Sequence, residues 1–207
     1  MLFHKSNRLS YLYLGMFLIF IFGCSRMNEI EEGLLIEIIE SPKNASEVFP
    51  DDWLGYWEGE VEIHDVNGLK QKIPIALDHQ KTETLGTYIW AIIYGEDTVA
   101  GRRQYYLKDI PEESGHYVVD EKNTILLDHY YINGHLYSQF EVMGTHITSI
   151  MYKEGDEMHF DIISSQFEPI RINRDTIYLG EEIPEVKGFK TLRLQTSVLH
   201  KKNTLSK

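Results

Sequence analysis

The chain has 207 residues and a net charge of −12 at neutral pH. This length suffices for one domain with a sizeable core, and the acidic excess repels phosphate backbones, which argues against a nucleic-acid-binding protein. Cys24 is the single cysteine, so a disulfide within the chain is excluded.

The segment before Cys24 has the features of a secretion signal. Lys5 and Arg8 precede an apolar run over 11–22, and Gly23 follows it. A stable bilayer span needs about 20 apolar residues, so this run is too short and a cleaved signal over 1–23 is predicted. An ordinary secretory signal with an incidental cysteine is the alternative.

The sequence Ile-Phe-Gly-Cys over 21–24 resembles the lipobox of bacterial lipoproteins, in which the chain is cut before the cysteine and the new N-terminus is acylated. The resemblance implies lipid attachment at Cys24. Acyl chains would hold the protein in a membrane at about 0.8 kcal/mol per buried methylene group. We therefore expect a membrane-anchored lipoprotein of the bacterial cell envelope, with the outer membrane as the favoured location.

The remaining chain divides by composition into a tether and a folded part. Residues 24–50 form an acidic tether with one short apolar stretch over 34–39, which suits a short strand or a helical turn. From Trp53 onward, short β-branched and aromatic runs recur about every 8 to 12 residues between turn-forming residues, as in antiparallel all-β domains. A barrel is predicted over 51–180, followed by a C-terminal extension over 181–207 that is either a closing strand with a tail or an outer tail.

Alternating patterns predict the individual strands. Glu58, Glu60 and Glu62 alternate with Trp57 and its apolar neighbours, which gives one wet and one dry face and suits a barrel or sandwich. Asn67-Gly68 and Asn133-Gly134 both fit a two-residue type I′ turn, because both positions tolerate positive φ. The predicted strands cover 55–64, 71–78, 87–94, 102–107, 116–120, 124–132, 135–143, 145–152, 157–164 and, less regularly, 171–178.

The first of these strands opens with Gly-Tyr-Trp-Glu-Gly over 55–59, and this G-x-W-x-G pattern resembles the opening of the calycin group, which includes lipocalins, fatty-acid-binding proteins and nitrobindin-like barrels. The resemblance covers about 53–164. It implies an antiparallel up-and-down β-barrel of about 8–10 strands, in which the tryptophan plugs one end and the glycines let the strand coil at the closing corner. The interior of such barrels holds an apolar or cofactor ligand. No cofactor is assigned here, because the late histidine expected of a haem-binding relative would be His200, in the expected tail.

The predicted ligand site is a pocket inside this barrel for a small apolar or amphipathic molecule. Aromatic rings would supply contact area, and one cation and one anion would orient the ligand. The residues are Trp57, Trp90, Tyr94, Arg103, Tyr105, Tyr137 and Glu141.

Two other interpretations of these residues stay open. Arg103 and Glu141 could form a buried structural pair, and Trp57 and Trp90 could be ordinary core. A cavity of about 300 Å³ or more favours ligand binding, whereas a filled interior favours a non-catalytic structural or interaction lipoprotein with an envelope partner.

The sequence gives little support for a metal site or an active site. The histidines are scattered and are interpreted as surface residues near turns. A turn at Asn133-Gly134 would place His129 and His135 on opposite faces, so these two could not share one metal ion. Hydrolase, metalloprotease and nucleotide-binding motifs are absent from the sequence. A non-enzyme is therefore favoured, because an enzyme would need an inward histidine hydrogen-bonded to a carboxylate in the cavity.

Overall fold

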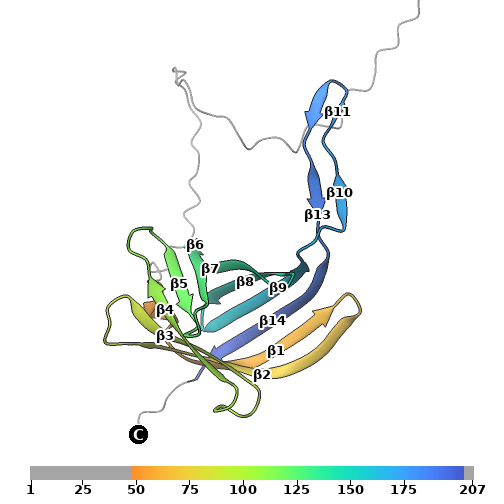
Figure 1. Cartoon of the computed structure of the whole chain (residues 1–207). Coiled ribbons are helices and arrows are strands. Elements are labelled where there is room, and N and C mark those ends of the chain that lie inside the picture. Colours follow the sequence, from red (N-terminus) through yellow and green to blue (C-terminus); the bar gives the residue numbers. More distant parts are fainter. Residues whose placement is uncertain (1–47, 203–207) are drawn as a thin grey trace, which may run out of the picture. The chain divides into compact units, whose positions relative to one another are not determined.

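The computed structural model describes residues 48–202, which form a closed antiparallel β-barrel (Figure 1). Each barrel strand pairs with the next barrel strand along the chain, and the last one pairs with the first to close the barrel. The strands are β1 (Gly55–Asp65), β2 (Gly68–Lys81), β3 (Thr87–Tyr94), β4 (Arg102–Asp109), β5 (His116–Asp120), β6 (Leu126–Ile132), β7 (His135–Val142), β8 (Thr145–Glu154), β9 (Glu157–Gln166) and β14 (Thr191–Lys201). The predicted fold class, an all-β up-and-down barrel, is confirmed.

The predicted signal over 1–23 and the lipidation site Cys24 lie outside the described residues. Within residues 48–202, the structure holds no helix with the length and apolar character needed to cross a bilayer.

The turn between β6 and β7 forms as its sequence predicts. Ile132 lies opposite His135, so Asn133 and Gly134 are the two central residues. Their φ angles are 48° and 81°, and a type I′ turn requires positive φ at both central positions.

The turn between β1 and β2 differs by one position from the prediction. Asp65 pairs with Gly68, so Val66 and Asn67 occupy the centre of the turn, and only Gly68 has positive φ, at 98°. The carboxylate of Asp65 accepts a hydrogen bond from the Asn67 backbone N–H at 2.7 Å. This side-chain bond stabilises a different turn around the same Asn-Gly pair, so the predicted type I′ geometry is wrong here.

The barrel closes where β1 meets β14, and Gly59 lies at this junction. It pairs with Leu199, and a side chain at Gly59 would collide with the backbone carbonyl oxygen of Val198. Only glycine therefore permits this approach of the two strands. Trp57, two residues earlier, is fully buried, so both residues have the positions that the G-x-W-x-G pattern implied.

Aromatic side chains fill one end of the barrel. The short 3-10 helix η1 (Asp51–Trp53) places Trp53 there, fully buried, and its carbonyl oxygen accepts a hydrogen bond from Trp57 Nε1 at 3.0 Å. Phe49 packs against the rings of Trp53 and Tyr131 with centroid distances of 4.7 and 4.4 Å. We call Phe49, Trp53 and Trp57 the aromatic plug.

A two-stranded arm, residues 167–190, leaves the barrel between β9 and β14 (Figure 1). The predicted strand 171–178 therefore lies in this arm, and the later segment β14 completes the barrel. Large apolar side chains are exposed on the arm, among them Ile177 at 72% and Leu179 at 87%. The arm contains β10 (Arg171–Asn173), β11 (Thr176–Tyr178), β12 (Glu181–Ile183) and β13 (Val186–Gly188), paired as β10 with β13 and β11 with β12.

Candidate ligand-binding site

The barrel encloses a cavity of about 140 Å³ that opens to solvent. This volume is below the roughly 300 Å³ expected of a ligand pocket, yet the interior is not filled. A cavity of about 150 Å³ is large enough for a benzene ring. The lining side chains are mostly aromatic and aliphatic with three polar ones: Trp90, Ile92, Tyr94, Tyr105, Val119, Leu127, Leu136, Phe140, Ile147, Met151, Phe160, Ile162, Glu121, His129 and Ser149.

Three of the predicted site residues, Trp90, Tyr94 and Tyr105, lie together on the cavity wall. Trp90 on β3 pairs with Tyr105 on β4, and Tyr94 shares the inner face of β3 because alternate residues of a strand point the same way. Burial raises the pKa of the Tyr94 phenol. The hydroxyl therefore stays protonated at neutral pH and can donate a hydrogen bond.

Two other predicted site residues lie near the interior but do not line the cavity. Trp57 belongs to the aromatic plug, in agreement with its interpretation as core. Arg103 has the same strand parity as Tyr105 but is exposed, and its guanidinium carbon lies 5.8 Å from the centroid of the Tyr94 ring. Arg103 is thus at the rim of the cavity.

The inward position predicted for Tyr137 and Glu141 is wrong. The inner face of β7 carries Leu136 and Phe140, so residues of odd number on this strand point outward. Glu141 is exposed, and its carboxylate accepts a hydrogen bond from the backbone N–H of Gly144. The proposed pair between Arg103 and Glu141 does not form for the same reason.

A half-buried ion pair does form one residue away from Arg103. The Arg102 guanidinium donates to the Asp78 carboxylate at 2.8 Å. Arg102 alternates with the cavity-lining Tyr105 on β4. Asp78 pairs with Ala91, which alternates with the cavity-lining Trp90 on β3, so this pair lies on the outer face of the barrel.

His129 is a cavity-lining residue that the sequence interpretation assigned to the surface. Its Nδ1 lies 3.0 Å from the Leu127 carbonyl oxygen, and a carbonyl can only accept, so Nδ1 carries the proton. Burial lowers the pKa of His129, which keeps the ring neutral at pH 7. The remaining nitrogen, Nε2, is then a hydrogen-bond acceptor.

His79 was also interpreted as a surface residue but is fully buried, and it lies on β2 opposite the cavity-lining Trp90. Its ring stacks on Trp90 with a centroid distance of 3.5 Å and an interplanar angle of 7°. Neither ring nitrogen makes a hydrogen bond within residues 48–202, and the neighbouring Trp53 carbonyl oxygen already accepts one from Trp57. Burial lowers the pKa of His79 to about 3 and outweighs the opposing effects of that carbonyl and of Asp78.

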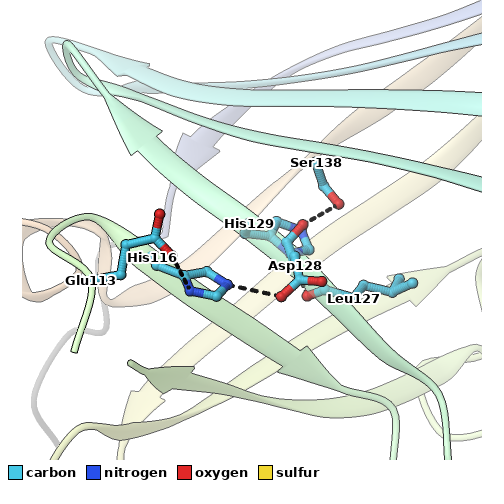
Figure 2. Close-up of polar contacts among 6 residues, drawn as sticks. All are labelled: Glu113, His116, Leu127, Asp128, His129 and Ser138. Carbon is cyan, nitrogen blue, oxygen red and sulfur yellow. Dashed lines mark hydrogen bonds and ion pairs between the residues drawn. The ribbon is translucent and has the colours of Figure 1, made fainter. Parts of the chain in front are cut away.

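A third histidine lies in a polar cluster on the outside of the barrel. Figure 2 shows His116 between two carboxylates, with Nε2 2.8 Å from Asp128 Oδ1 and Nδ1 3.1 Å from Glu113 Oε2. The Ser138 hydroxyl donates to the Asp128 backbone carbonyl at 2.7 Å and does not contact His116. The cluster therefore lacks the nucleophile–base contact of a catalytic triad.

Among residues 48–202, no histidine that lines the cavity is hydrogen-bonded to a carboxylate. His129 is inward, but its recorded partner is the Leu127 carbonyl rather than a carboxylate. Among the described residues, no three His, Cys, Asp or Glu side chains converge in a way that could hold a metal ion. His200, expected in a tail, lies in β14 with an exposed side chain.

The comparisons with known proteins bear on the fold. No model of a known protein family matches the sequence, and neither does any curated protein. A solved structure of a protein of unknown function from the DUF3598 family of Nostoc punctiforme aligns with a TM-score of 0.50 and 12% identity, over 73% of this chain and 48% of that one. This chain thus spans about half the length of that protein.

A second solved structure, an S-type phycobiliprotein lyase from Guillardia theta, aligns with a TM-score of 0.46 and 7% identity, over 73% of this chain and 89% of that one. Neither identity is high enough to transfer a ligand or an activity. The DUF3598 structure supports a shared barrel fold and nothing finer.

Proposed function

We propose that the barrel binds a small molecule with an apolar body. The observation that carries this proposal is the open cavity, whose wall is mainly aromatic and aliphatic with three polar side chains. Ligand sites commonly have this composition, because apolar side chains supply contact area and a few polar groups fix the orientation of the ligand.

The cavity volume limits the size of the ligand. A space of about 140 Å³ admits one ring or a short branched chain, by comparison with a cavity of about 150 Å³ that holds benzene. A longer ligand would extend through the opening toward the rim, where Arg103 and the Tyr94 ring lie.

The test is a pair of substitutions on β8 in the full-length chain. Ser149→Leu fills part of the cavity and should weaken binding of single-ring probes, measured by calorimetry, by at least about tenfold. Thr148→Leu, on the outer face of the same strand, should leave the affinity unchanged. Equal affinities in both variants, or a purified chain that binds no probe at all, would contradict the proposal.

We also propose that the chain is a lipoprotein held at the cell envelope through Cys24. The support is the apolar run over 11–22 followed by the lipobox-like sequence over 21–24. Cys24→Ala should move the protein from the membrane fraction to the soluble fraction. If the variant still fractionates with membranes, lipid on Cys24 is not the anchor.

A non-catalytic interaction lipoprotein is a second candidate, and two observations favour it. The cavity is smaller than most ligand pockets, and the arm exposes apolar side chains that a partner in the envelope could cover. Failure of every single-ring probe to bind would favour this candidate over ligand binding.

A further inference from the structure

The charge of the cavity wall indicates which ligands the barrel would accept. Among the described residues that line it, Glu121 is the single carboxylate, and no lysine or arginine is present. Glu121 directly follows Asp120, which pairs with Tyr106, so Glu121 comes next to Tyr105 across the strands. The one formal charge on the wall is therefore negative and adjacent to an aromatic ring.

The aromatic side chains of the wall add to this negative potential. The faces of Trp90, Tyr94 and Tyr105 carry the negative part of the ring quadrupole, which attracts cations within about 6 Å. The same property is already visible at the rim, where the Arg103 guanidinium lies over the Tyr94 ring. A ligand cation in the cavity would lie beside the same kind of aromatic side chain.

His129 completes this set as a neutral acceptor. Because its Nδ1 donates to the Leu127 carbonyl, its Nε2 presents a lone pair, and no side chain or backbone group within residues 48–202 is recorded as its hydrogen-bond partner. A neutral imidazole does not repel a cation, and it can accept a hydrogen bond from an ammonium N–H. The wall thus offers a carboxylate, a lone pair and ring faces.

We propose that the cavity selects a small organic cation: a protonated amine attached to a single apolar ring or a short branched chain. This inference rests on the proposed ligand-binding function and names its ligand class. The ammonium group would lie near Glu121 and the aromatic faces, and the apolar body would pack on the aliphatic part of the wall. An anionic ligand is the competing case, but its possible partner Arg103 is exposed at the rim, and Glu121 would repel the anion.

Three single-ring probes of similar size and different charge test the inference. Benzylamine is a cation at neutral pH, benzyl alcohol is neutral, and benzoate is an anion. We expect calorimetry with the full-length chain to show benzylamine binding at least about tenfold more tightly than benzyl alcohol, and benzoate binding most weakly.

A matched pair of variants locates the selectivity. Glu121→Gln should reduce the preference for benzylamine over benzyl alcohol to about threefold or less. Glu112→Gln removes the same charge from an exposed loop residue that does not line the cavity, and it should retain the full preference. Loss of the preference in both variants would assign it to net charge and overturn the inference.

The probes also separate this inference from the proposed function. Equal binding of benzylamine and benzyl alcohol would overturn the cation inference and leave ligand binding intact. The tightest binding by benzoate, lost in Arg103→Gln, would replace the cation by an anion. Binding of none of the three would contradict the ligand-binding function itself.

Discussion

Steric contact with the backbone makes Gly59 intolerant of any side chain. At Gly188, in the arm, an added methyl group would meet its nearest neighbour, a side-chain atom of Arg171, only at 3.7 Å, which is ordinary contact. The space for a side chain is therefore absent at Gly59 and present at Gly188.

We predict that Gly59→Ala lowers the free energy of unfolding by about 2 kcal/mol or more, because the new methyl group forces β14 away from β1. Gly188→Ala should change it by less than about 1 kcal/mol. Urea unfolding followed by circular dichroism measures both variants. Similar losses in both would show that the approach at Val198 does not limit stability.

Burial of the neutral His79 ring links stability to pH. The folded state holds the pKa of His79 at about 3, whereas an unfolded histidine titrates near its ordinary value of about 6.5. Between these values the unfolded chain takes up a proton that the folded chain does not. Stability that is complete above about pH 6.5 is therefore lost as the pH falls toward 3, by up to about 1.4 kcal/mol per pH unit.

Replacing His79 by leucine should flatten this pH dependence. Carboxyl groups also titrate in the same range, so the slope attributable to His79 is the difference between the wild type and His79→Leu. Urea unfolding at about pH 6.5, 5.5 and 4.5 should give a shallower loss of stability in the variant. Parallel slopes in the two proteins would mean that the folded state protonates His79 readily.

Some site residues could be predicted from the sequence because their large rings share one face of a strand. The run over 87–94 is apolar on both faces, and the face that carries Trp90 and Tyr94 is the one that lines the cavity. On β7, the odd face carries Gln139 and Glu141 together with Tyr137, and this polar pair is the signal that Tyr137 points outward. On this strand the alternation of polar residues, and not ring area, indicates which face points inward.

At the scale of the strands, local turn chemistry explains which boundaries were predictable. The Asn133-Gly134 turn was predictable because both residues favour positive φ. The next turn uses Met143 and Gly144 with φ angles of 50° and 75°, and methionine rarely occupies this region. The predicted strand over 135–143 therefore ran one residue into that turn.

Strand patterns alone wrongly predict that residues 171–178, which lie in the arm, form a strand of the barrel. A two-stranded hairpin in water is marginally stable, and the arm keeps many apolar side chains exposed. Its base lies where Gln166 and Lys190 meet, with the Gln166 N–H donating to the Lys190 carbonyl at 2.8 Å. Residues that line the cavity all lie outside the arm.

We predict that the arm is dispensable for the barrel. Replacing 167–189 by Asn-Gly would join β9 to β14 through a two-residue turn, because Gln166 and Lys190 already face each other. The shortened chain should melt cooperatively within a few degrees of the wild type and bind single-ring probes with unchanged affinity. Loss of folding on this replacement would show that the arm is part of the core structure.

At the scale of the whole molecule, closure depends on contacts between the two ends of the described chain. Trp57 pairs with Lys201, and the Lys202 N–H donates to the Tyr56 carbonyl oxygen at 2.8 Å. The meander could be predicted, since consecutive antiparallel runs usually pair. The closing strand could be predicted only as one of two alternatives for 181–207, because it depends on long-range register. The cavity volume could not be predicted, because it depends on packing across the barrel.

Removing β14 should therefore abolish the folded barrel. A chain that ends at Lys190 leaves β1 and β9 as unpaired edges, and we expect aggregation and no cooperative thermal transition. A chain that ends at Lys202 keeps the closing strand and should melt like the wild type. Cooperative melting of the shorter chain, followed by circular dichroism, would contradict this dependence on closure.

The aromatic plug and the closing pair place Phe49 and Lys202 at the same end of the barrel. Trp90 links that end to the cavity, because its ring lies 6.1 Å from the Phe49 ring and also lines the cavity. In a chain trimmed to residues 48–202, a reporter or affinity tag joined before Val48 or after Lys202 would thus begin at the plugged end, and immobilisation through such a tag would leave the cavity rim at Arg103 and Tyr94 accessible to solutes.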